Sequence, residues 1–271
     1  MGSCIYCGRP AGFLRSAHRE CADQNVAARS GIKALLSDAL TDMRTDIDAT
    51  ARQVLALAAR GGVNEKDIQE AAKSAFQDFV EHVLDDGLLS AAEETRAVSI
   101  MRAFALPSST PGHGRLVKAG ILRDLDEGRA EPRVEIEDVP ISLKRGEVLL
   151  WCFQEVQLGE MRSQSHYVGG SRGVSFRVAK GVYCRVGAFK GQRVSTSSLQ
   201  MTGEGSLFIT NRALSFVGDK TLKVALNKII SVDPRAEGII VHREQANPKP
   251  LVFMVDDPWF ATNLILKASS L

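Results

Sequence analysis

Apolar residues recur at every third or fourth position along much of the first half of the chain, which is the spacing of one buried helix face. The stretch 32–57 therefore predicts one long amphipathic helix, which the glycine pair 61–62 would end. Asn64, with Asp67 three residues later, predicts the N-terminal cap of a second helix. The pattern favours a helical region.

A third helix is predicted to begin after Ser90, because Glu93 stands three residues later, as in a capping box. A fourth helix is expected over residues 115–127. The buried face of the third helix is expected to carry Val98, Met101 and Phe104.

The segment 85–93 connects the second and third of these helices. It matches the second half of an EF-hand calcium loop, with Gly87 at the turn. In that register the first and third ligand positions fall on His82 and Leu84, which offer no hard oxygen ligand, so we expect no calcium site. The pattern Asp-Gly-x-Leu-Ser-x-x-Glu resembles the loop between two helices of TerB-like helical domains, and a capped helix hairpin explains the same residues.

Beyond residue 134 the apolar period changes from about 3.6 residues to 2, which is the alternation of β-strands. Runs rich in Val, Ile, Phe and Tyr, separated by glycines and charged turns, predict a sandwich or barrel of antiparallel strands. The pair Asp257-Pro258 then predicts the start of a helix, whose Trp259 is expected to pack into the open end of the barrel. The strands are predicted at 147–156, 173–178, 182–186, 206–210, 214–217 and 238–242.

The segment Gly205–Gly218, with the sequence GSLFITNRALSFVG, resembles the strand–turn–strand signature of GRAM domains and bacterial pleckstrin-homology-like (PH-like) domains. The runs 226–232 and 238–241 and the helix at Trp259 follow in the order of that family. The resemblance covers about 134–271. It implies a PH-like antiparallel β-barrel, capped by one helix, that binds an anionic lipid, a peptide or another protein.

Three of the five cysteines lie near the start of the chain. Cys4 and Cys7 are separated by two residues, and so are His18 and Cys21, so the two pairs can supply four ligands to one tetrahedral ion. A redox pair and a chance cluster are the alternatives, although no strand precedes Cys4 as a thioredoxin-like motif requires. Residues 4 to about 30 resemble a treble-clef-type zinc finger, and a structural zinc is predicted.

These patterns predict an α+β chain in three parts: a zinc-finger motif (1–31), an α-helical domain (32–128) and a PH/GRAM-like β domain (134–271). A length of 271 residues allows more than one core, and a net charge of +2 argues against a general polycation. Neither a membrane-spanning apolar run nor a secretory signal is visible. We expect a reduced, cytoplasmic protein that can lie at a membrane surface. Its oligomeric state is left open.

The stretch 160–193 contains seven basic residues and one acidic residue, a local charge of +6 in a nearly neutral chain. Glycine-rich turns with neighbouring Arg and Lys suit a phosphate or carboxylate, whereas a plain solvated face of a strand is the alternative. The candidate ligand- or partner-binding residues are Arg172, Arg177, Lys180, Arg185, Lys190 and Arg193.

Motifs of enzymes are absent from the sequence: it has no phosphate loop, no HExxH pair and no nucleophile elbow. Cys152 is interpreted as a small apolar residue of a strand, and His242 as a surface or cross-strand residue. The leading hypothesis is therefore a non-enzymatic adaptor or scaffold with a protein partner or an anionic lipid or phosphate ligand. An enzyme that is active only within a complex is a weaker alternative. The other alternative is a nucleic-acid-binding finger whose phosphate contacts are Arg9, Arg15, Arg19 and Arg29.

Overall fold

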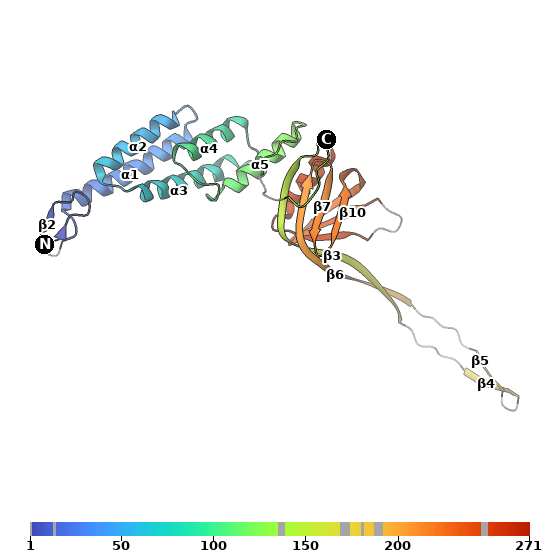
Figure 1. Ribbon diagram of the computed structural model, residues 1–271. Helices are drawn as coiled ribbons and strands as arrows, with labels where there is room; N and C mark the ends of the chain where they lie inside the picture. The colour runs from blue at the N-terminus through green and yellow to red at the C-terminus, as the bar shows by residue number, and fades with distance from the viewer. Residues whose placement is uncertain are drawn as a thin grey trace. The chain divides into compact units, whose positions relative to one another are not determined.

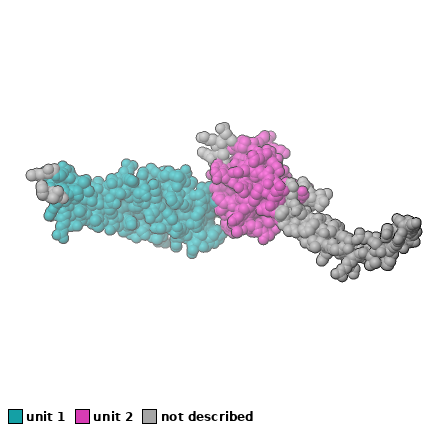
Figure 2. Space-filling model, turned by 90° about the horizontal axis from the view of Figure 1, so that it is seen from below, with its two compact units in different colours: residues 1–127 teal, residues 128–271 magenta. Residues whose placement is uncertain are grey.

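The computed structural model of the chain describes residues 2–12, 15–134, 139–168, 174–179, 182–186, 192–244 and 249–271, and between 162 and 198 it describes the backbone alone. The chain divides into two compact units, Met1–Glu127 and Gly128–Leu271, which we call unit 1 and unit 2 (Figure 2). The expectation of an α+β class is confirmed, since unit 1 is helical and unit 2 is built mainly from strands.

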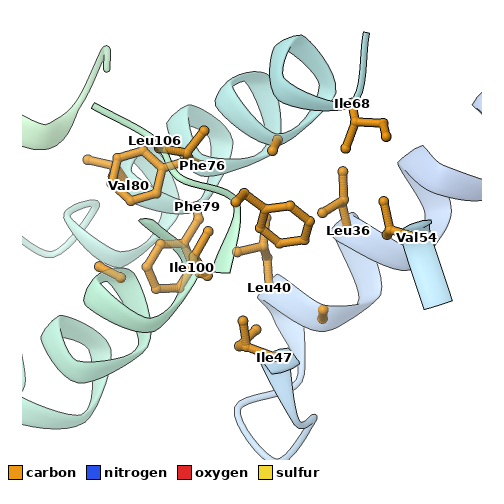
Figure 3. Packing of buried hydrophobic residues seen from close by; sticks show 14 of the residues in the cluster. Leu36, Leu40, Ile47, Val54, Ile68, Phe76, Phe79, Val80, Ile100 and Leu106 are labelled. Atoms are coloured by element: carbon orange, nitrogen blue, oxygen red, sulfur yellow. The ribbon is translucent and has the colours of Figure 1, made fainter. Parts of the chain in front are cut away.

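In unit 1 a short hairpin, β1 (Gly2–Ser3) with β2 (Pro10–Gly12), precedes the helices (Figure 1). Aliphatic and aromatic side chains from every helix of the unit meet in one core, in which Phe76 and Val80 are fully buried (Figure 3). The helices are α1 (Arg19–Thr41), α2 (Ile47–Gly61), α3 (Glu65–Val83), α4 (Ala91–Ala103) and α5 (His113–Asp126).

The single helix expected over 32–57 is wrong, because the chain breaks between α1 and α2. Asp46 caps the new start: one carboxylate oxygen accepts hydrogen bonds from the backbone N–H groups of Asp48 and Ala49. The apolar spacing continues across the break because Ile47 and Val54 still point into the core, so periodicity alone gave no sign of it.

Arg96 of α4 holds this break in place. Its side chain is only 8% exposed, and its guanidinium donates to backbone oxygens at the end of α1 and in the turn that follows. Those carbonyls have no partner within the helix, so Arg96 supplies donors that the helix cannot. The acceptors belong to Ala39, Asp42, Met43 and Thr45.

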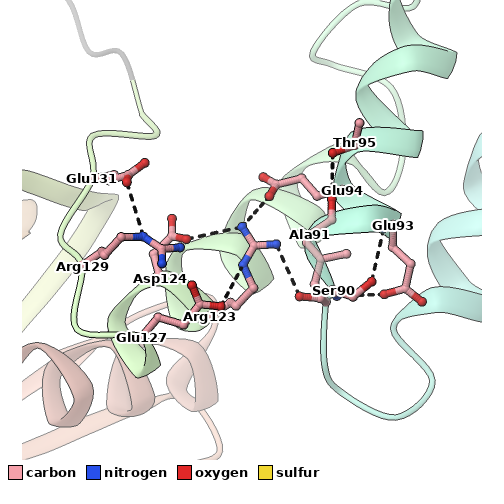
Figure 4. Close-up of polar contacts among 11 residues, drawn as sticks. Ser90, Ala91, Glu93, Glu94, Thr95, Arg123, Asp124, Glu127, Arg129 and Glu131 are labelled. Atoms are coloured by element: carbon pink, nitrogen blue, oxygen red, sulfur yellow. Dashed lines mark hydrogen bonds and ion pairs between the residues drawn. The ribbon is translucent and has the colours of Figure 1, made fainter.

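The predicted helix caps are confirmed. The side chain of Asn64 accepts the backbone N–H of Asp67 at 2.9 Å. Ser90 and Glu93 form a reciprocal capping box, with each side chain accepting the other residue's backbone N–H (Figure 4). Arg123 of α5 reaches the same helix and pairs with Glu94 at 2.5 Å, so α4 and α5 are joined by charge as well as by apolar packing.

The expected buried face of the third helix is partly wrong. Val98 is 60% exposed, whereas Phe104 is buried as predicted. Ala97 and Ile100 are buried in addition, because the inward face of α4 includes the positions on either side of Val98.

Unit 2 contains a seven-stranded antiparallel sheet with the order β8-β7-β6-β3-β11-β10-β9. Strands β4 (Val174–Ala179) and β5 (Val182–Val186) pair separately. The seven strands are β3 (Leu149–Val168), β6 (Gln192–Thr210), β7 (Ala213–Gly218), β8 (Thr221–Ala225), β9 (Ile229–Arg235), β10 (Gly238–Arg243) and β11 (Leu251–Met254).

The described strand pairings leave β8 and β9 as the two outer strands, so hydrogen bonds do not close this sheet and the barrel stays a prediction. A short 3₁₀ helix, η1 (Leu226–Lys228), connects those two strands. Helix α6 (Pro258–Ser269) begins as predicted, with Asp257 accepting the backbone N–H of Phe260 at 3.0 Å. It packs against β9, β10 and η1.

Trp259 does not fill the core, and that prediction is wrong. Its side chain is 62% exposed, whereas Phe260 is 1% exposed and meets the ring of Trp151 edge to face at 5.1 Å. The cap at Asp257 sets the rotation of the helix, so the position after Trp259 is the one that faces the sheet.

Strands β3 and β6 are longer than the sequence predicts, and they extend beyond the sheet (Figure 1). The neighbour β11 pairs with β3 only over Gln157–Glu160, and β7 pairs with β6 only over Gly205–Ile209. Farther out, β3 and β6 pair with each other as far as Val168 and Gln192. We call the parts of the two strands that no third described strand pairs with, 161–168 of β3 and 192–203 of β6, the ribbon.

Candidate metal centre

Cys4, Cys7, His18 and Cys21 come together at the start of unit 1. Their ligand atoms all lie within 4.8 Å of one another. His18 Nδ1 lies 3.4 Å from the sulfur of Cys7 and 3.7 Å from that of Cys21. Tetrahedral zinc with ordinary bond lengths separates a sulfur and a nitrogen ligand by about 3.6 Å, so the group has the size of such a site.

The ring of His18 is oriented for ligation. Its Nε2 lies 2.9 Å from the backbone oxygen of Pro10, a distance at which it donates a hydrogen bond. A proton on Nε2 leaves Nδ1 with a free lone pair on the side of the sulfurs of Cys7 and Cys21. A backbone carbonyl that fixes the tautomer in this way is the usual second partner of a metal-bound histidine.

Local backbone geometry explains how the ligands converge. The N–H of Gly8 donates to the oxygen of Cys4 at 2.8 Å, and the N–H of Cys4 donates to the oxygen of Arg9 at 2.7 Å. Gly8 has φ of 71°, a left-handed conformation in which a side chain would be strained. His18 is the N-cap of α1, so Cys21 lies one turn along and on the same side of the helix.

The thiols have unequal proton affinities. Burial alone raises the pKa of Cys4, but hydrogen bonds from the backbone N–H groups of His18, Cys7 and Tyr6 outweigh it and lower the pKa to about 6. Burial, together with the neighbouring thiols of Cys7 and Cys4, raises the pKa of Cys21 to about 11. Crowded thiolates repel one another, and a divalent cation would remove that repulsion.

The residues therefore fit a metal ion with three sulfur ligands and one nitrogen ligand. With four protein ligands, the site leaves no open position for a substrate or a reactive water, which is the arrangement of a structural ion.

The metal centre is tied to the helices by residues that the sequence did not single out. Asn25, one turn after Cys21 and 3% exposed, donates from its side-chain amide to the oxygens of Gly61 at 2.8 Å and Gly62 at 3.1 Å. Gly62 ends α2 in a left-handed conformation, and a side chain there would lie 3.4 Å from Tyr6 of the hairpin. A buried polar residue inside the helical pattern was the available signal.

One of the four arginines proposed as phosphate contacts is already engaged. Arg29 forms an ion pair with Asp67 at the start of α3, and its Nε donates to Asn25 at 2.9 Å. The other three, Arg9, Arg15 and Arg19, are exposed.

The basic candidates from 160–193 fall where the structure describes little. Arg172, Lys180 and Lys190 lie outside the described residues. Arg177 belongs to β4, Arg185 to β5 and Arg193 to β6, strands in which only the backbone is described at these positions. The structure therefore places part of this set on the paired strands beyond the sheet.

Two further sequence candidates have structural explanations. His242 lies 3.0 Å from the carboxylate of Asp233 on the adjacent strand, which is a cross-strand pair. Cys152 is partly buried, and burial raises its pKa to about 11, as expected for an unreactive thiol.

In the loop 85–93, Glu93 is occupied by its capping box and Asp86 accepts the N–H of Leu88.

Among the described helices, none is both long and apolar enough to cross a membrane. Fold and site together define an α+β chain with a Cys₃His group on a helical unit and a separate antiparallel sheet. Compared with family models, curated proteins and solved structures, the chain matched none of them.

Proposed function

We propose that this chain is a non-enzymatic adaptor: a zinc ion stabilises unit 1, and a PH-like unit 2 binds an anionic ligand or protein partner. The observation that carries the proposal is the extension of β3 and β6 beyond the sheet, which leads into and out of the stretch 160–193 with its local charge of +6. A projecting, positively charged element attracts anions at a distance and is accessible to them.

Strand order supports the PH-like part of the proposal. Strands β3, β6, β7 and β8 follow one another as a meander, β9, β10 and β11 form a second one, and β3 pairs with β11 to join them. A single helix after the last strand packs against the second meander. A many-stranded β domain closed by one terminal helix is the plan that the resemblance implies.

Zinc is the metal that the donor set favours. Thiolate and imidazole ligands at tetrahedral spacing suit zinc, whereas calcium and magnesium prefer oxygen ligands. The ion would fix the hairpin and the first turn of α1, and every sulfur and nitrogen donor of the group would be used in holding it.

Charge reversal tests the binding part. Wild-type protein and the variant Lys180→Glu with Lys190→Glu are compared on vesicles containing phosphatidylserine, on vesicles of phosphatidylcholine alone and on heparin. We expect the wild type to be retained on the anionic surfaces at low salt, and both the variant and high salt to remove that retention.

The matched control is Arg145→Glu with Arg235→Glu, which changes the net charge by the same amount at two exposed positions of unit 2 outside the ribbon. Equal loss in the control would show that total charge matters and the ribbon does not. Wild-type protein that ignores every anionic surface at low salt would refute the proposal.

A further inference from the structure

Among the described strands, none pairs with the outer edge of β6 along the ribbon. Pairing with β7 stops at Gly205, and just beyond it the N–H of Asp219 donates to the oxygen of Glu204 at 3.0 Å. From Gly203 back to Gln192, the described strands pair with β6 on the β3 side alone. The backbone N–H and C=O groups of that edge can therefore accept another strand.

The sequence does not protect this edge. Natural sheet edges usually carry charged side chains or proline, which prevent another chain from pairing. Residues 194–203, Val-Ser-Thr-Ser-Ser-Leu-Gln-Met-Thr-Gly, contain neither a charge nor a proline. This composition favours pairing.

A β-bulge marks the base of the ribbon. Leu158 is opposite Gly203, but the next residue, Gly159, is opposite Met201, so Thr202 is the extra residue. The hydroxyl of Thr202 donates to the oxygen of Leu158 at 3.2 Å. A bulge increases the local twist, and this one lies where β6 loses contact with β7.

An apolar patch lies next to the same edge. Leu199 is 44% exposed and Met201 is 43% exposed. Both pack over Gly159: a β-carbon at that position would lie 2.7 Å from Leu199 Cδ1 and 3.2 Å from Met201 Sδ. Gly159 thus makes room for two apolar side chains whose outer surfaces remain in water, and methionine adapts to varied apolar partners.

We infer that the outer edge of β6, over residues 192–203, binds an extended, acidic segment of a partner protein by strand addition. The segment's backbone hydrogen-bonds to the edge, and its apolar side chains cover Leu199 and Met201. Its acidic residues complement Arg162 and Arg193 of the ribbon and the five further Arg and Lys residues that the sequence places between the two ribbon strands. This inference rests on the proposed function, because it names the partner of the same basic element.

A peptide is favoured over a lipid or nucleic acid because an open strand edge is completed by another backbone. Phosphates can neutralise arginine and lysine, but they offer no alternating N–H and C=O groups in strand register. The unprotected edge and the adjacent apolar patch are explained together only by an extended chain.

The test uses the full-length protein and fluorescent peptides of roughly twelve residues, enough to span the edge. One peptide alternates Val and Glu, a second alternates Val and Lys, and a third is the Val–Glu peptide with every backbone nitrogen methylated. We expect saturable binding of the first and weaker binding of the second. Methylation should abolish binding, because it removes the donors of strand pairing.

Leu199→Ser with Met201→Ser should weaken binding of the Val–Glu peptide by about tenfold or more. Ile230→Ser with Leu266→Ser, which removes two other exposed apolar side chains of unit 2, should leave it unchanged. Thermal unfolding of each variant establishes that it is folded.

Equal binding of the methylated peptide would overturn strand addition and leave the proposed anion binding in place. Failure of the Val–Glu peptide to bind at about millimolar concentration would overturn it too. Sedimentation tests for a dimer. If the wild type is a dimer and Leu199→Ser with Met201→Ser makes it a monomer, the edge binds a second copy of the chain and the inference is wrong. If, in addition, the wild type is retained neither on heparin nor on the anionic vesicles at low salt, both proposals are refuted.

Discussion

In unit 1 a few polar side chains fix where helices begin and end, whereas in unit 2 a continuous apolar core holds the strands together. Asn25 reaches the end of α2, and Arg96 reaches the end of α1. In unit 2, the ring of Phe216 packs at a tilt against Phe253 and that of Phe260 meets Trp151 edge to face, with other apolar side chains around them. When a polar side chain that bonds a helix end is removed, no neighbouring group replaces its hydrogen bonds. The stabilisation from an apolar core is instead spread over many contacts.

The two units can be followed separately in one sample. Both tryptophans, Trp151 and Trp259, belong to unit 2, so tryptophan fluorescence reports that unit. The five helices described in unit 1 supply most of the helical circular dichroism, because unit 2 has one described helix of that kind, α6.

Metal removal is expected to have the largest effect. Zinc analysis should give about one equivalent per chain, and Cys21→Ala should reduce it towards zero. The free energy of unfolding of unit 1 should fall by about 5 kcal/mol or more, since isolated zinc fingers depend on their ion for folding. Helical dichroism on heating, with and without a chelator, measures the change.

Tryptophan fluorescence, recorded during the same heating, follows unit 2 and shows whether its unfolding changes as well. A protein that carries no zinc and has a disulfide between Cys4 and Cys7 would contradict the metal centre. If chelation lowers the unfolding temperature seen by dichroism and by fluorescence equally, the two units do not unfold separately, and the difference between them is refuted.

Phe260→Ala should cost unit 2 about 3–5 kcal/mol, because it removes a fully buried ring that packs on Trp151. Trp259→Ala, one position earlier on the same helix, should cost less than about 1 kcal/mol because that side chain is exposed. Urea unfolding followed by fluorescence tests both variants, because Trp151 is present in each. Equal losses of unfolding free energy in the two variants would mean that α6 is rotated about its axis, with Trp259 facing the sheet as much as Phe260 does.

Sequence signals predicted the contacts that are short in range. The helix starts at Asn64, Ser90 and Asp257 were predictable because each cap and its partner lie within three residues. The grouping of Cys4, Cys7, His18 and Cys21 was predictable because the two pairs have a spacing that metal coordination explains.

Longer-range features could not be predicted from the sequence. The carbonyls that Arg96 satisfies are 51 to 57 residues away, so nothing near Arg96 shows its role. Trp259 was misplaced because burial of a large aromatic is a good general rule, while the cap at Asp257 sets the rotation of the helix. The length of the ribbon was missed because the segment 192–203 has few apolar residues, and therefore no clear alternation.

Arg96→Ala should destabilise unit 1 by about 2–4 kcal/mol, because several carbonyls would lose donors that are each worth about 1 kcal/mol. Arg96→Lys should recover part of the loss, since one ammonium group reaches fewer of these oxygens. Helical dichroism during urea unfolding measures both variants. A loss below about 0.5 kcal/mol for Arg96→Ala would mean that the turn between α1 and α2 is stable without the hydrogen bonds of Arg96. Unit 1 would then tolerate the removal of a polar contact as unit 2 is expected to.

Glu147 is the polar contact in unit 2 that most resembles those of unit 1. Its carboxylate is 7% exposed and accepts hydrogen bonds from the N–H of Lys144, the hydroxyl of Thr210 and the ammonium of Lys223. Burial alone raises the pKa of Glu147, but these donors outweigh it and hold the pKa below the ordinary value of 4.5.

Glu147→Gln should cost about 1–2 kcal/mol near neutral pH, the smallest of these effects, because the partly exposed Lys223 is screened by solvent. A lowered pKa in the folded state means that the stabilisation is complete above about 4.5 and is lost as the pH falls through the folded value. The difference between wild type and variant should therefore shrink below that pH. Urea midpoints from tryptophan fluorescence at a series of pH values measure it. A difference that stays constant into acid would show that charge on Glu147 contributes nothing, and that apolar packing alone holds unit 2.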